Sequence, residues 1–438
     1  MRERAARAAG LAATATGVAA MSTTEYAQPH RVSRGVTAMQ EPAWQVEVQG
    51  LWKVFGDKPE RALDAAHGPK SRSEIQDELG LVVALRDVSF RVDRGQIFVV
   101  MGLSGSGKST LVRALIRLVE PTRGSISIDG EDVLSYSTSQ LMQFRRQKIA
   151  MVFQNYGLLP HRSVLDNVAL GLEIRGVDKE TRYRMASDSI ETVGLGGWEH
   201  YRPREMSGGM QQRVGLARAL AVNPDMLLMD EPFSGLDPLI RRELQDELIS
   251  LQTKLKKTIV FITHDLNEAL KIGDRIAVMR DGEIIQEGSP EEIVTLPSDE
   301  YVTDFVKDVS RAKVIQAKAV MQESDVVVYE RQGPRAALHI MDSHKLEAVF
   351  LIGRDFTLRG LLTKDRVIAL IDERRSTLEG ADIDPATTTT PDALVEDIIP
   401  IAAQTRHPIA VVGDTRALLG EIRPGALLAG MAEGGPET

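Results

Sequence analysis

The sequence predicts an α/β protein, in which a parallel sheet with flanking helices is followed by a smaller α+β tail. Two short apolar runs, residues 96–101 and 226–229, have the composition of buried central strands, and helical spacing follows the first over residues 111–118. Residues 311–438 contain a repeated unit of two strands and a helix. These three observations define the predicted fold class.

The first apolar run leads into a glycine-rich loop. The residues that match a phosphate-binding motif are Gly102, Leu103, Ser104, Gly105, Ser106, Gly107, Lys108, Ser109 and Thr110. The glycines let backbone N–H groups turn toward phosphate oxygens, and the following helix adds its positive end. Lys108 supplies a charge to the β- and γ-phosphates, and the Ser109 hydroxyl suits Mg²⁺. With this strand and helix around it, the loop predicts binding of a nucleoside triphosphate.

The composition excludes several classes of protein. The 438 residues are enough for two or three domains, and 43% hydrophobic with 26% charged residues is ordinary for a globular protein. A net charge of −9 without a basic region argues against a nucleic-acid partner. The absence of cysteine excludes disulfides and thiolate metal sites. No apolar run approaches the roughly 18 residues that span a bilayer, so a membrane role requires a partner.

Residues 1–40 are expected to be a disordered extension or an over-extended gene start. Arg2, Arg4 and Arg7 precede an alanine-rich run that is too weakly apolar for a secretion signal. Met21 and Met39 are alternative starts.

The second apolar run ends in two carboxylates, Asp230 and Glu231. Because the carboxyl ends of parallel strands meet at one edge of a sheet, we expect them beside the phosphate loop. There Asp230 would orient Mg²⁺, and Glu231 would polarise the attacking water. A surface acidic pair is the alternative, but a phosphate-loop protein needs such an acid.

A third motif, Met206–Arg213, lies between these two in the chain. Ser207 has the chemistry of a helix N-cap, and Gly208 and Gly209 leave the helix terminus open to a ligand. With these motifs the chain resembles the ATPase subunits of ABC transporters, whose signature matches Ser207-Gly208-Gly209. Met210 stands where that family usually has glutamine, and Gln211 follows it.

The resemblance implies a P-loop NTPase, with a RecA-like ABC ATPase core over residues 44–300 and a helical subdomain over about residues 155–224. It implies ATP and Mg²⁺ as ligands. It also implies a tandem CBS domain, a module that often binds adenosine nucleotides or senses ionic conditions, over residues 311–438.

The resemblance assigns further residues by position. Gln154 matches the glutamine that ligates Mg²⁺ and senses the transmembrane partner, Asp237 ends the D-loop that connects two active sites, and His264 matches the switch histidine at the γ-phosphate. Phe55 aligns with the aromatic that stacks on adenine; a core position is the alternative.

In this family the signature of one subunit closes on the phosphate loop of another. The chain has one of each motif, so both cannot complete the same site in a monomer. We therefore expect a head-to-tail homodimer with two equivalent ATP sites.

An insertion and the tail narrow the resemblance. Residues 57–84 replace a short hairpin; Ser71–Glu74 resembles a capping box there, and Ile75 and Leu79 share a helix face. In the tail, Thr363 and Asp365 stand where CBS modules hold ribose and phosphate, whereas the second repeat lacks this pair. Nucleotide binding, ionic sensing and a purely structural role stay open for the tail.

Together these features resemble the ATP-binding subunit of glycine betaine/proline/choline importers. The resemblance implies ATP-driven solute uptake through a separate integral-membrane permease and a separate substrate-binding protein, with this chain at the cytoplasmic face of the plasma membrane. An importer motor for another amino acid or a polyamine, and a soluble ABC ATPase without a transport role, are the alternatives.

Overall fold

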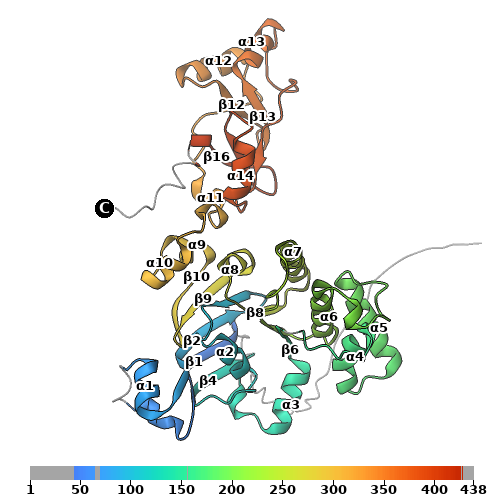
Figure 1. Ribbon diagram of the computed structural model, residues 1–438. Helices are drawn as coiled ribbons and strands as arrows, with labels where there is room; N and C mark the ends of the chain where they lie inside the picture. Colours follow the sequence, from blue (N-terminus) through green and yellow to red (C-terminus); the bar gives the residue numbers. More distant parts are fainter. Residues whose placement is uncertain (1–43, 65–69, 155, 426, 428–438) are drawn as a thin grey trace, which may run out of the picture. The chain divides into compact units, whose positions relative to one another are not determined.

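The computed structural model describes residues 44–64, 70–154, 156–425 and 427, so the expectations for residues 1–40 lie outside the described residues. The principal sheet has six strands in the order β10-β9-β3-β8-β7-β6 (Figure 1). All run parallel except β10, which pairs antiparallel at one edge. The bounds are Ile97–Met101 (β3), Ile149–Val152 (β6), Met226–Asp230 (β7), Thr258–Thr263 (β8), Arg275–Arg280 (β9) and Glu283–Gly288 (β10).

The two strands that the sequence predicts are β3 and β7, and β8 lies between them. Alternate residues of β3 enter different cores: Val99 packs among the helices on one face, and Phe98 and Val100 pack on the other. Both faces of the strand are buried, which explains why its sequence is apolar throughout.

A second, antiparallel sheet with the order β2-β1-β4-β5 covers one face. The phosphate-loop helix α2 contacts strands of both sheets, and Phe90 stacks on Phe98 with ring centroids 5.0 Å apart. The bounds are Trp44–Phe55 (β1), Val82–Asp93 (β2), Lys108–Leu115 (α2), Arg123–Ile128 (β4) and Glu131–Asp132 (β5).

The insertion forms a short 3-10 helix, Pro59–Leu63 (η1), and a helix, Arg72–Leu79 (α1). The predicted capping box is present, because Ser71 accepts from the Glu74 N–H and the Glu74 carboxylate accepts from the Ser71 N–H. Ile75 is buried in a small core that the insertion shares with β1 and β2.

The other helices lie mainly around the principal sheet. In the stretch of the predicted helical subdomain, α4, α5 and α6 pack on one another. The bounds are Val133–Ser135 (η2), Thr138–Gln147 (α3), Val164–Ile174 (α4), Lys179–Thr192 (α5), Pro203–Glu205 (η3), Gly208–Ala221 (α6), Pro238–Leu255 (α7), Leu266–Ile272 (α8), Pro290–Thr295 (α9), Glu300–Val306 (α10), Arg311–Lys313 (η4) and Ala317–Val320 (α11).

The C-terminal tail contains the strands of the predicted repeat, and the helix predicted after the second copy lies mostly outside the described residues. Its two three-stranded sheets, β11-β12-β13 and β14-β15-β16, share one topology: a parallel pair followed by an antiparallel pair. The bounds are Val327–Tyr329 (β11), Pro334–Ser343 (α12), Ala348–Ile352 (β12), Leu358–Thr363 (β13), Lys364–Asp372 (α13), Thr388–Thr389 (β14), Val395–Ala402 (α14), Ile409–Val412 (β15) and Leu418–Ile422 (β16). All the described residues belong to one compact unit, so the domain boundary between residues 300 and 311 stays a prediction.

A buried amide fixes the loop that precedes α4. Asn167 is fully buried; its Oδ1 accepts from the Leu159 N–H at 2.7 Å, and its Nδ2 donates to the carbonyls of Leu159 and Ser163. One side chain therefore replaces the backbone partners that this irregular segment lacks.

We predict that Asn167→Ala lowers the free energy of unfolding by about 2 kcal/mol, because it leaves buried backbone groups without partners. Calorimetric unfolding should show a lower transition temperature than in the parent. Gln143→Ala, at an exposed position of α3, is the control and should change little. Equal transition temperatures for the two variants would contradict the assigned role of Asn167.

Candidate nucleotide site

A cavity of about 590 Å³ opens beside the carboxyl end of β3. It brings together most of the predicted site: loop residues 103–105 and 107–110, Gln154, Glu231 and His264. They come from the β3–α2 loop, from the first turn of α2 and from segments that follow β6, β7 and β8. The edge that the sequence predicts for the carboxylates is therefore the edge of the phosphate loop.

Close backbone packing requires glycine at two loop positions. A Cβ on Gly102 would lie 2.2 Å from the Met279 carbonyl oxygen, and one on Gly107, whose φ is +109°, would lie 2.5 Å from that of Ala84. Gly102 does not line the cavity, and neither does Ser106, which is buried. Gly102 and Ser106 therefore shape the loop.

The Lys108 ammonium is buried at the first residue of α2. Its Nζ donates to the carbonyl oxygens of Gly102 at 2.8 Å and Leu103 at 2.9 Å. Burial lowers the pKa of Lys108, and the nearby carboxylates of Glu231 and Asp230 oppose that shift. A buried cation next to a helix N-terminus is a strong attractor for phosphate.

Oxygen donors suitable for Mg²⁺ meet at the start of α2. The Ser109 hydroxyl donates to Asp230 Oδ1 at 2.9 Å, and Asp230 is buried at the end of β7. Gln154 lines the same cavity. A hydroxyl, a carboxylate and an amide beside a phosphate loop fit Mg²⁺, which takes few protein ligands and completes its shell with phosphate oxygens and water.

Glu231 and His264 contact each other in the cavity lining. His264 Nδ1 lies 3.0 Å from Glu231 Oε2. Glu231 has a φ of +46°, an unusual backbone conformation for a residue with a side chain, and its N–H donates to the Ile262 carbonyl at 3.0 Å. The neighbouring strand β8 therefore holds the backbone that carries this carboxylate.

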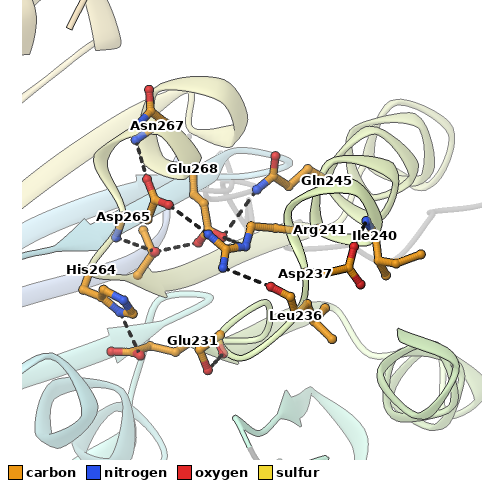
Figure 2. Close-up of polar contacts among 12 residues, drawn as sticks. Glu231, Leu236, Asp237, Ile240, Arg241, Gln245, His264, Asp265, Asn267 and Glu268 are labelled. Carbon is orange, nitrogen blue, oxygen red and sulfur yellow. Dashed lines mark hydrogen bonds and ion pairs between the residues drawn. The ribbon is translucent and has the colours of Figure 1, made fainter. Parts of the chain in front are cut away.

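Behind His264 lies a polar network that we did not predict (Figure 2). Arg241, on α7, donates to the Asp265 carboxylate at 3.1 Å and to the Leu236 carbonyl at 3.2 Å. Leu236 precedes Asp237 in the D-loop, and Asp265 follows His264. The Arg241 guanidinium thus connects the predicted D-loop to the segment around His264 and Asp265, here called the switch segment.

Glu268 completes this network from α8. It is buried; Thr263 donates to its Oε2 at 2.6 Å, Gln245 donates to its Oε1, and Arg241 Nε lies 3.7 Å from Oε1. Burial raises the pKa of Glu268, while the Thr263 hydroxyl and Arg241 act in the opposite direction. The available sequence signal was the four-residue spacing of Arg241 and Gln245, which puts both on one face of α7.

The signature residues Ser207, Gly208, Gly209, Met210 and Gln211 do not line the cavity of their own chain. Ser207 is the N-cap of α6, as predicted, and accepts from the Met210 N–H. Gly208 is exposed, whereas a Cβ on Gly209 would lie 2.5 Å from Ile240. Gly209 is therefore small because α6 packs closely on α7, and the terminus is open only at Ser207 and Gly208.

Three other predicted residues also lie outside the cavity lining: Asp230, Asp237 and Phe55. Asp237 caps α7, accepting from the Ile240 N–H at 3.1 Å. Phe55 ends β1 with 42% of its surface exposed and Lys53 Nζ 4.7 Å from its ring centroid. The alternative of a core position for Phe55 is wrong, and adenine stacking stays a prediction.

Two lining residues were missed by the sequence analysis: Ala84 and Arg72. Arg72 belongs to the insertion, where the capping box predicted the helix but no local pattern indicated what its first residue would contact.

Among the described residues, none of the helices has both the length and the apolar character that a membrane crossing requires.

Comparisons with known proteins agree with this geometry. The family model described as ABC transporter matches residues 85–234, and a model for an AAA domain matches residues 199–270. The glycine betaine/carnitine transport ATP-binding protein of Listeria monocytogenes is 48% identical over 88% of this chain and 97% of its own length. The trimethylamine N-oxide transport system ATP-binding protein of Ruegeria pomeroyi is 47% identical, over 75% of this chain and 95% of its own length.

A solved structure, part of the ABC transporter complex cbiONQ of Clostridium perfringens, matches 62% of this chain and 98% of its own with a TM-score of 0.50. Its identity of 23% supports the fold alone. This chain covers almost the whole length of its glycine betaine transport relatives. It therefore belongs to the ATP-binding subunits of ABC transporters, in the glycine betaine importer family.

Proposed function

We propose that this chain is the ATP-hydrolysing motor of an importer for quaternary amines of the glycine betaine and choline type, or for proline. The observation that carries the proposal is the single cavity that joins Lys108, Ser109, Glu231 and His264. The solute class comes from the relatives, whose names give glycine betaine, carnitine and trimethylamine N-oxide.

The residues of the cavity divide the chemistry among them. Lys108 and the loop N–H groups bind the β- and γ-phosphates, and Glu231 polarises the water that attacks the γ-phosphate. His264 lies 3.0 Å from Glu231, so it orients that carboxylate. Its place in the cavity lining would also let it contact the γ-phosphate. Ser109, Gln154 and Asp230 would hold Mg²⁺, which would supply positive charge to the phosphates.

The transported solute is recognised elsewhere. A quaternary ammonium binds best in a cage of aromatic rings, and only 5% of this chain is aromatic. A separate substrate-binding protein and an integral-membrane permease therefore select the solute, and this chain attaches peripherally to the permease on the cytoplasmic side.

The transport assignment is tested by reconstituting the chain with the permease and binding protein that accompany it. We expect ATP-dependent uptake of glycine betaine-type solutes from a panel that also contains other amino acids and polyamines. Preferential uptake of a polyamine or of an unrelated amino acid would overturn the solute class. Co-purification with ribosomes and without a permease would overturn the transport role.

The site is completed by a second copy of the chain. Ser207 and Gly208 form an exposed helix terminus that does not line the cavity of its own chain. Such a terminus binds phosphate well. In a two-fold, head-to-tail dimer each signature faces the phosphate loop of the partner subunit, which gives two equivalent ATP sites.

We predict that Glu231→Gln protein sediments as a dimer with Mg·ATP and as a monomer with Mg·ADP, because trapped ATP joins the two halves. Sedimentation velocity measures this directly. Ser207→Arg in the same background is the matched control and should stay monomeric with ATP. A monomer under all conditions would contradict the proposed geometry.

The tail is proposed to be a tandem CBS domain that regulates the motor. Its two repeats share one topology, and Thr363 caps α13, accepting from the Arg366 N–H. The tail would bias the dimer between active and resting states in response to ionic strength or an adenine nucleotide.

Deletion of residues 311–438 tests this regulatory role. We expect ATP hydrolysis by the reconstituted transporter to persist and its dependence on salt or adenine nucleotide to disappear. The parent transporter, assayed in parallel, should keep that dependence. Identical regulation in both proteins would leave the tail without the proposed role.

A further inference from the structure

The insertion contributes a cation to the nucleotide cavity. Arg72 is the first residue of α1, and its side chain lines the cavity together with the phosphate loop. Its Nη1 donates to the Gly105 carbonyl oxygen at 3.1 Å. Apart from the signature residues of α6, the residues assigned above to phosphate binding lie in the β3–α2 loop, at the start of α2 or after other sheet strands. Arg72 therefore adds a contact from a separate element.

The backbone that carries Arg72 is firmly held. The capping box of Ser71 and Glu74 fixes the first turn of α1, and the Lys70 carbonyl just before it accepts from Arg86 Nη1 at 2.8 Å. One turn later, Ile75 is 1% exposed in the small core of the insertion. The guanidinium is therefore delivered to the edge of the phosphate loop by a packed element.

The contacts of Arg72 leave most of its hydrogen-bonding capacity for a ligand. A guanidinium has five N–H donors in a planar fork. The hydrogen bond to Gly105 uses one, and a carboxylate oxygen of Asp281 is 3.8 Å away on a side chain that is 74% exposed. An exposed ion pair of this length contributes little. A polyphosphate in the cavity is a stronger acceptor.

We infer that Arg72 is a nucleotide-binding residue whose guanidinium donates to the phosphate chain of ATP, beside Lys108. The inference rests on the proposed binding of ATP in this cavity. The insertion is thereby part of the nucleotide site. The competing role is that Arg72 acts only as a brace, holding the Gly105 carbonyl and hence the shape of the loop.

The two roles predict different ATP affinities when residue 72 loses its charge. In full-length protein with Glu231→Gln, which prevents turnover, Mg·ATP binding is titrated by calorimetry for Arg72→Ala and Arg72→Gln. Glutamine can still donate to the Gly105 carbonyl but carries no charge. Direct phosphate binding predicts that both variants bind Mg·ATP about tenfold more weakly than the parent. It also predicts that the affinity of the parent falls more steeply with salt than that of Arg72→Gln.

Two controls complete the experiment. Arg61→Ala removes an exposed arginine of the same insertion that does not line the cavity, and it should bind ATP like the parent. Lys108→Ala should abolish binding. Parent-like affinity of Arg72→Gln would overturn the inference, as would parent-like affinity of Arg72→Ala. Undiminished binding by Lys108→Ala would instead overturn the ATP site itself.

Discussion

The burial of the Lys108 ammonium beside the carboxyl edge of a parallel sheet is the constraint on which the site depends. Burial of a cation is unfavourable unless other groups compensate for the lost water. Here the carbonyls of Gly102 and Leu103 accept from it, and Asp230 and Glu231 supply nearby negative charge. The same arrangement leaves a positive, glycine-lined cavity at the start of α2, which suits a polyphosphate.

Sheet order brings the remaining groups to that cation. Because β8 lies between β3 and β7, the phosphate loop, the two carboxylates at the end of β7 and His264 after β8 share one edge. The unusual backbone of Glu231 is held by a hydrogen bond to Ile262 of β8. Behind it, Arg241 joins Leu236 to Asp265, so the D-loop and the switch segment share one polar network. In the proposed dimer, a displacement of either segment would reach the other through these contacts.

Local signals made much of this structure predictable. The glycine loop, the capping box at Ser71 and the strands of the tail repeat depend on residues close in sequence. The contacts of Arg72 with Gly105 and of Arg241 with Asp265 join segments far apart in the chain, so no local pattern specifies them. The same limit applies to Gly209, whose small size serves packing against Ile240, and to Phe55, which is exposed although the sequence also allowed a core position.

In the proposed role of the chain, ATP bound at Lys108 drives solute movement through a separate permease. The most direct measurement is the uptake of labelled glycine betaine by intact cells in which Lys108→Ala replaces the parent subunit at equal abundance. We expect accumulation to fall to the level of cells that lack the subunit. Accumulation equal to that of the parent would contradict the proposed role of ATP bound at Lys108 in driving uptake.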